Sequence, residues 1–176
     1  MKIENHSKVK LPRGTVRVIE SVTETVPREH LRGIDLVRLV DRIRDTRLRN
    51  SSQATEIPGL YHPKQGGQQA WIEIALETIL PYSKPFHKQL IPRLSFKGNL
   101  AAILVSLIGQ HYYMTLRHSV KRGQLESSIK AYTEKHLRRW HENQHTLRSR
   151  LFRPLQPTLE RWTKSLQKRA KQEKRR

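Results

Sequence analysis

The sequence contains no cysteine, few acidic residues and no long apolar run. Without cysteine, the 176 residues form neither disulfides nor thiolate zinc sites. The longest nearly uninterrupted apolar run, Leu100–Gly109, is about half of the roughly 20 residues that a membrane-spanning helix needs. We therefore expect no transmembrane segment. Residues 1–8 are mixed and polar, with no apolar core of a secretory signal behind them, so we expect a cytoplasmic protein.

The scarcity of acidic residues leaves a strong excess of positive charge. Lys and Arg total 35 against 15 Asp and Glu, which gives a formal net charge of +20. The last third of the chain, from Arg117, holds 18 of the basic residues and only 5 acidic ones. Such a region attracts polyanions in a salt-dependent way. The polyanion-binding candidates are Arg161, Lys164, Lys168, Arg169, Lys171, Lys174, Arg175 and Arg176. A solvated basic helix explains the same pattern more simply, and an amphipathic helix on an acidic membrane is a further alternative.

The apolar pattern predicts a small β-sheet followed by helices, which is an α+β arrangement. Alternating or short apolar runs predict strands at 15–20, 34–43, 59–63 and 70–75, the last two joined by a glycine turn. The run 34–43 also fits a helical face, and we favour the strand. Helical spacing predicts helices at 28–32, from residue 100, at 129–151 and after residue 157.

Proline and asparagine positions set two expected boundaries. Pro81, Pro85 and Pro92 predict irregular chain over 80–93, since proline blocks both regular elements. Asn99 is a suitable N-cap for a helix that starts at Leu100. The resulting division has a polar N-terminal segment over 1–14, an α+β domain over 15–152 and a basic helical C-terminal extension over 153–176.

The helix expected from Leu100 has the frame of a zinc-peptidase helix without its reactive residues. A metal-hydrolase helix carries His at two positions four apart and Glu after the first, so that both imidazoles reach one ion and the carboxylate reaches its water. The corresponding run here is Leu104-Val105-Ser106-Leu107-Ile108-Gly109-Gln110-His111.

From about Thr15 to Trp140 the chain resembles the minimal zincin-like metallopeptidases, which are compact α+β domains with a short sheet and an H-E-x-x-H active helix. The similarity includes Gly59-Leu60-Tyr61 and the strand at 70–75. It continues through four frame residues of the helix and through segments that look like the family's following turn and helix. The frame residues are Leu104, Ile108, Gly109 and His111, and the later segments are Arg117–Arg122 and Glu126–Trp140.

The resemblance also places the family's reactive positions. The first zinc histidine falls on Ser106, the general-base glutamate on Leu107 and the second zinc histidine on Gln110. Glu126 matches a downstream acidic position that supplies a third ligand. Ser and Gln are poor zinc ligands beside neutral imidazoles, and Leu does not accept a proton from bound water. The resemblance therefore implies a degenerate centre, with no catalytic residue, no metal site and no cofactor.

Two further histidines belong to the same region. His111 and His118 are seven residues apart, which separates them by roughly 10 Å along a helix, too far to chelate one ion without other ligands. Together with Glu126 they are candidates for lining the site. A partly buried, hydrogen-bonding role for each histidine is the simpler interpretation.

A literal H-E-x-x-H occurs later, at His141-Glu142-Asn143-Gln144-His145. Both imidazoles would project from one side of a helix, with Glu142 placed to activate zinc-bound water. Its polar surroundings are unlike the buried, apolar setting of a catalytic zinc helix. A solvated helix face is therefore the favoured interpretation, and zinc is expected only if this motif is used.

Three functional hypotheses follow. We favour a non-catalytic zincin-like domain with a binding or scaffold role and an unidentified protein or polyanion partner. The second hypothesis is a nucleic-acid-associated protein that acts through its basic C-terminal third. The third is an active zinc metallopeptidase using His141, Glu142 and His145. An unrelated α+β domain with a chance match to the zincin-like frame is the alternative to the resemblance itself.

Overall fold

The structure is a computed structural model, and it describes residues 1–8, 10–43, 57–80, 86–116 and 122–152. Within the later helices it describes side chains at 92, 95–116 and 123–144. The elements are β1 (Lys2–Asn5), α1 (Thr15–Thr25), η1 (Arg28–Leu31), β2 (Ile34–Val40), β3 (Gly59–His62), β4 (Ala70–Ala75), α2 (Leu76–Ile79), α3 (Phe86–His111), η3 (Tyr112–Leu116), η4 (Arg122–Gln124) and α4 (Leu125–Phe152).

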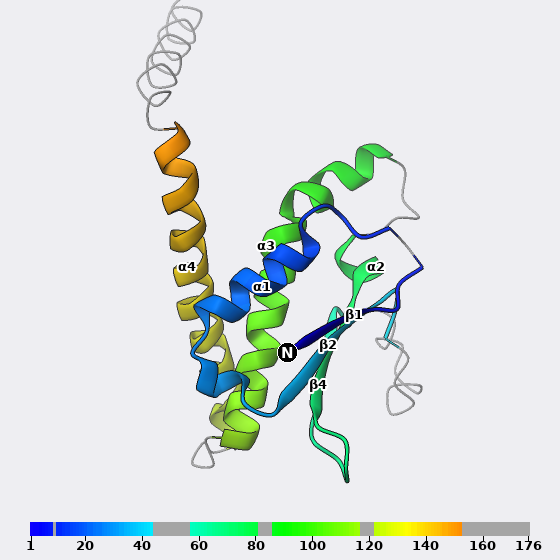
Figure 1. The fold of residues 1–176 in the computed structure, drawn as a ribbon, viewed down its shortest axis with the longest axis vertical. Coiled ribbons are helices and arrows are strands. Elements are labelled where there is room, and N and C mark those ends of the chain that lie inside the picture. Colours follow the sequence, from blue (N-terminus) through cyan, green and yellow to red (C-terminus); the bar gives the residue numbers. More distant parts are fainter. Residues whose placement is uncertain (9, 44–56, 81–85, 117–121, 153–176) are drawn as a thin grey trace, which may run out of the picture. The chain divides into compact units, whose positions relative to one another are not determined.

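The four strands form one mixed sheet in the order β1-β2-β4-β3 (Figure 1). Strands β1, β2 and β4 are parallel, and β3 is antiparallel to β4. The turn between β3 and β4 contains Gly66 at φ 55°, a left-handed conformation that glycine adopts without strain. The α+β class and the hairpin at 59–75 are therefore confirmed. Strand β1 lies within the segment 1–14, for which the sequence predicts no strand.

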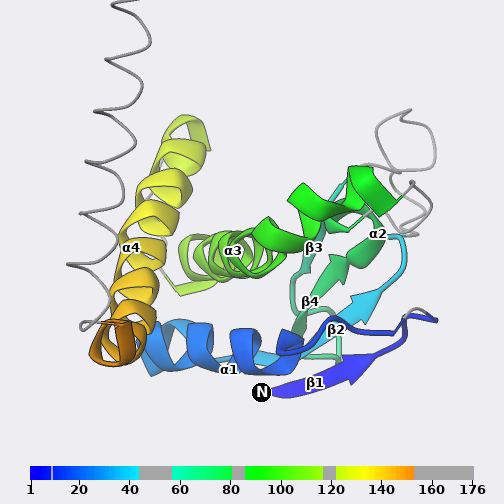
Figure 2. The same ribbon diagram turned by 90° about the horizontal axis from the view of Figure 1, so that it is seen from above.

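Helices α1 and α3 lie on the same face of the sheet (Figure 2). The buried core joins that face to the apolar sides of both helices, and water exclusion from these side chains is the main stabilising contribution. The fully buried members include Ile19, Val22, Val37, Leu39, Ile72, Ile74, Leu100, Leu104 and Ile108.

The strand expected at 15–20 is wrong, because these residues begin helix α1. The buried residues of α1 are Thr15, Val18, Ile19 and Val22, which share one helical face, whereas Val16 is exposed. The short alternation of Val16 and Val18 also fits a strand. Packing of this face against α3 overrides the strand preference of branched residues.

The irregular chain expected over 80–93 is also wrong for its last part. Helix α3 starts at Phe86 and contains Pro92. A single proline removes one backbone donor, and the helix continues on both sides of it. Asn99 is consequently an interior residue and not an N-cap, and its side-chain amide donates to Ser95 Oγ (3.3 Å).

The other expected elements within the described residues are confirmed. The short helix after Pro27 is η1, the strand favoured for the run 34–43 is β2, which ends at Val40, and the helix at 129–151 is α4. The helix expected after residue 157 lies outside the described residues. Among the residues that the structure describes, no helix has both the length and the apolarity that a membrane crossing requires.

The chain divides into two units, Met1–Trp140 and His141–Arg176. The sheet, helices α1 and α3 and the first part of α4 all belong to Met1–Trp140. The candidate site and every contact described below lie within this unit.

Candidate functional site

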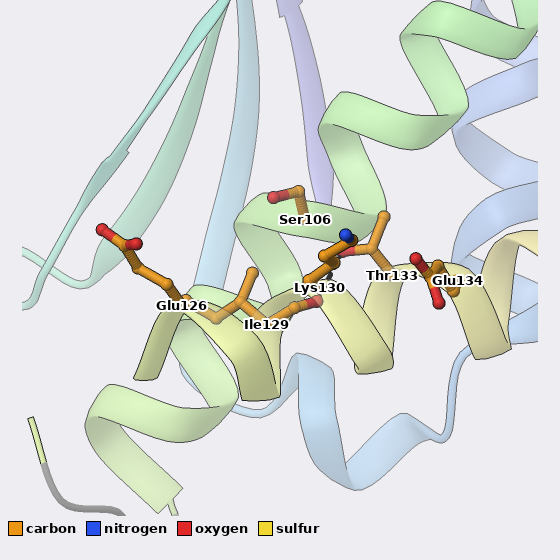
Figure 3. Close-up of a pocket in the computed structure, with 6 residues that line it drawn as sticks. All are labelled: Ser106, Glu126, Ile129, Lys130, Thr133 and Glu134. Atoms are coloured by element: carbon orange, nitrogen blue, oxygen red, sulfur yellow. Dashed lines mark hydrogen bonds between the residues drawn. The ribbon is translucent and has the colours of Figure 1, made fainter. Parts of the chain in front are cut away.

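A cavity of about 360 Å³ lies between α3 and the first part of α4. We call it the α3–α4 cavity. Its lining residues are Ser106, from α3, and Glu126, Ile129, Lys130, Thr133 and Glu134, from α4 (Figure 3). The α4 residues recur at intervals of three and four, which places them on one face of that helix.

The α3–α4 cavity combines an apolar wall with charged ends. Glu126 and Glu134 lie at opposite ends of the row that Figure 3 shows, while Ile129 and Thr133 point toward α3 between them. Within the described part of the chain, neither carboxylate has a basic partner within 4.0 Å, and Lys130 has no acidic one. These charged groups are therefore available to a bound molecule.

Ser106, Leu107 and Gln110 lie in different surroundings in the structure. Ser106 is half-buried and faces the α3–α4 cavity. Leu107 is buried and packs against β3, where a Cβ on Gly59 would lie only 2.8 Å from Leu107 Cδ1. Gln110 is half-buried, one helical turn after Ser106. The described residues include no group of three or more His, Asp or Glu side chains arranged to hold a metal ion.

The fold brings together one pair of the positions that the resemblance singles out. Ser106 and Glu126 are 20 residues apart in the sequence, on two helices, and both line the α3–α4 cavity. Sequence spacing does not fix such a distance, because the turn between the helices decides it.

His111 is a buried, hydrogen-bonded residue at the end of α3. Its ring is 2% exposed and bridges two chain segments: Nε2 donates to the carbonyl oxygen of Arg32 (2.9 Å), and Nδ1 accepts from the Tyr61 hydroxyl (2.9 Å). Burial lowers the pKa of His111, and the bond to the Arg32 carbonyl opposes that effect only in part. His111 is therefore a neutral residue that joins α3 to β3 and to the turn before β2.

The other predicted candidates lie in or after α4, or in the segment before it. His141 and Glu142 are exposed, while the side chain of His145 lies outside the described residues. His118 and the basic candidates from Arg161 to Arg176 also lie outside them.

A second cavity, of about 460 Å³, lies at the carboxyl ends of the parallel strands and was not expected from the sequence. Its carboxylates have partners in the protein. Asp41 accepts from Ser7 Oγ and the Lys8 backbone N–H, and Glu77 pairs with Arg42. Asp41 and Glu77 therefore take part in local interactions that stabilise this end of the sheet.

A cluster of histidine and tyrosine rings at α4 was not predicted from the sequence. We call it the histidine–tyrosine cluster, and its members are His30, Tyr112, Tyr113, Tyr132 and His136. Tyr132 and His136 were expected on an apolar helical face. His30 belongs to η1, more than 100 residues earlier, so periodicity carried no signal for its approach to this face.

Comparisons of the chain with protein-family models, with curated proteins and with solved structures found no match.

Proposed function

We propose that this protein is a non-catalytic, zincin-like binding domain, and that the α3–α4 cavity holds a segment of a partner protein. The observation that carries the proposal is the joint presence of Ser106 and Glu126 at one cavity. By the resemblance, these positions correspond to the first and third metal ligands of the peptidase family. The proposal thus assigns the binding role to the place where that family has its reactive centre.

The side chains at this place suit binding better than hydrolysis. Ser106 is a poor zinc ligand, and Leu107 has no group that accepts a proton from water. Leu107 also packs against β3, so its side chain contributes to the core instead of to an open site. The general-base position has therefore become a packing position.

The lining residues indicate the chemistry of the partner. Ile129 and Thr133 provide a wall for one apolar side chain of the partner. Glu126 and Glu134 are carboxylates without ion-pair partners among the described residues, in a protein with a net charge of +20. Charge complementarity favours a segment in which Lys or Arg flanks the apolar side chain.

A displayed peptide library tests the binding role directly, with the full-length protein as bait. We expect enriched peptides to carry an apolar residue flanked by Lys or Arg. Ser106→Trp fills the α3–α4 cavity and should weaken their binding at least about tenfold, which is about 1.4 kcal/mol. Affinity is measured by titration calorimetry. Peptides that bind the Ser106→Trp protein as tightly as the original would show that this cavity is not the binding site.

The contribution of the two carboxylates at the ends of the cavity is tested against a control pair of glutamates on another helix. Glu126→Gln with Glu134→Gln should slow association with the basic peptide and reduce its salt dependence, because rim charges act mainly on the association rate. Glu20→Gln with Glu24→Gln changes the net charge equally at exposed positions of α1. Equal effects of the two pairs would mean that only the overall charge matters.

Restoring metal ligands tests the zincin-like geometry separately. Ser106→His with Gln110→His places two imidazoles four residues apart on α3, beside Glu126, while Leu107 is left to pack against β3. We expect about one zinc per chain by elemental analysis. Adding Glu126→Ala to this pair should weaken zinc binding at least about tenfold.

The control for zinc binding is a histidine pair elsewhere on a helix. Glu20→His with Glu24→His also has a spacing of four, on the exposed side of α1, and two imidazoles alone leave a zinc site incomplete. Equal zinc affinity of the two pairs, or no effect of Glu126→Ala, would contradict a zincin-like arrangement of α3 and α4.

A further inference from the structure

The buried side chains of the first part of α4 form a ridge against the rest of its unit. Tyr132, His136 and Trp140 are spaced four residues apart and are 3–5% exposed. Tyr132 packs against Gly109 of α3, and Trp140 Nε1 donates to Ser21 Oγ of α1 (2.8 Å). His136 lies between these two contacts.

His136 is the weak member of the ridge. Its Nδ1 is buried and has no hydrogen-bond partner among the described residues. Its ring centroid lies 4.2 Å from that of Tyr132 and 6.0 Å from that of His30. A half-buried imidazole, His30, and a buried one, His136, therefore meet edge to face between η1 and α4, and protonation of either ring disfavours protonation of the other.

The groups around this histidine pair favour the neutral form of His136. From its own helix, Lys135 and Arg139 add positive charge, and His30 faces it from η1. The rings of Tyr112, Tyr113 and Tyr132 complete the surroundings. The Tyr132 hydroxyl is hydrogen-bonded to His30 Nδ1 (2.9 Å), and burial raises the pKa of Tyr132. From α1 the neighbouring contact is Ser21, which does not titrate. The carboxylate of Glu29 lies 3.8 Å from His30 Nε2 and is itself largely exposed.

The pKa values agree with this geometry. Burial, followed by the charges of His30, Lys135 and Arg139, lowers the pKa of His136 from 6.5 to about 4. Burial also lowers the pKa of His30, and Glu29 opposes the effect. The released state of α4 thus binds protons more readily than the docked state. The free energy that favours the docked state of α4 therefore has its full value above pH 6.5 and decreases as the pH falls toward 4.

The same helix supplies most of the α3–α4 cavity. Ile129 and Thr133 lie next to Tyr132 and His136 around α4, so movement of the ridge away from α3 separates them from Ser106. We propose that protonation of the His30–His136 pair releases α4 and thereby removes one wall of the cavity, which makes partner binding sensitive to acid. This inference rests on the proposed binding function.

The release is measured by NMR on the full-length, ¹⁵N-labelled protein. The indole N–H of Trp140, assigned with Trp140→Phe, reports its bond to Ser21, and the ring signals of His136 report protonation. We expect both to change together between pH 6.5 and 4 while the backbone signals of the sheet persist. With a pKa of about 4 in the docked state against 6.5 in the released state, the equilibrium should move toward the released form by about 80-fold between pH 6.5 and 4, and by about 300-fold in all at still lower pH.

Two variants identify the responsible group. His136→Phe keeps a ring of similar size without a titrating nitrogen and should move the Trp140 transition to lower pH. His6→Asn, at an exposed histidine, should leave it unmoved. If His136→Phe does not fold, the wild-type titration decides. Two outcomes would contradict the release of α4. In the first, the Trp140 and sheet signals disappear at the same pH midpoint, which indicates global unfolding. In the second, His136 titrates at a pH different from that of the Trp140 change.

Peptide binding is measured across the same pH range with a peptide from the displayed library. Affinity that falls with the Trp140 transition supports the proposed regulation. Undiminished affinity below the transition would show that the cavity does not depend on docked α4. Absence of binding at every pH would contradict the proposed function alone, because the NMR measurement needs no peptide.

Discussion

Replacing His111 with leucine should lower the free energy of unfolding by about 4 kcal/mol. His111 is buried and satisfies two polar groups at once, the carbonyl oxygen of Arg32 and the hydroxyl of Tyr61. Leucine offers a hydrogen bond to neither group, and each buried group left without a partner costs about 1–3 kcal/mol. Urea denaturation followed by circular dichroism measures the loss.

Tyr61→Phe is the matched control for this prediction. It removes the hydroxyl donor to His111 Nδ1 and leaves the bond between His111 and Arg32 in place. We expect a loss of about 1–2 kcal/mol, clearly smaller than that of His111→Leu. A chelator such as EDTA should not change the stability of the wild-type protein, since both partners of His111 are protein groups. Equal losses in the two variants would show that the Arg32 bond contributes nothing.

Gly109→Ala should destabilise the protein by about 2 kcal/mol, although alanine is the better helix former. Gly109 lies inside α3, where a Cβ would be 2.8 Å from Tyr132 Cδ1 and 3.3 Å from Tyr132 Cγ. Tyr132 is buried in the ridge of α4, so its ring does not move aside without disturbing His136 and Trp140. Thermal and urea unfolding provide the measurement.

Gly98 lies in the same helix and provides a control, because alanine there should change the stability in the opposite direction. A Cβ on Gly98 would meet no atom within 4 Å, so Gly98→Ala should stabilise the protein by about 0.5–1 kcal/mol through helix propensity alone. Stabilisation by Gly109→Ala would contradict the close approach of Tyr132. A double-mutant cycle with Tyr132→Leu measures the coupling between the two positions.

Much of the element order is readable from the sequence because local patterns encode it. The hairpin at 59–75, the strand at 34–40 and the helix before Trp140 follow from apolar periodicity and from glycine at turns. One error occurred where a short pattern fits two structures. Thr15–Glu20 suits a strand as well as a helix, and the packing of Ile19 and Val22 against α3 decides for the helix.

The candidate site was only partly readable. Ser106, Leu107 and Gln110 were singled out only by the resemblance to the zincin-like helix, in which the two histidine positions are four apart and share a helical face. The burial of Leu107 against Gly59 and the approach of Glu126 to the side of Ser106 depend on other elements. His111 was considered for site lining, yet its ring faces Tyr61 and Arg32.

The sequence by itself determined the basic charge and the absence of thiol chemistry. These are properties of composition. The tertiary structure decided that Ser106 and Glu126 share a cavity, that His111 is a structural bridge and that His136 is buried without a partner for Nδ1. Such contacts join residues that are distant in the chain, and only the packing of helices on the sheet sets their separation.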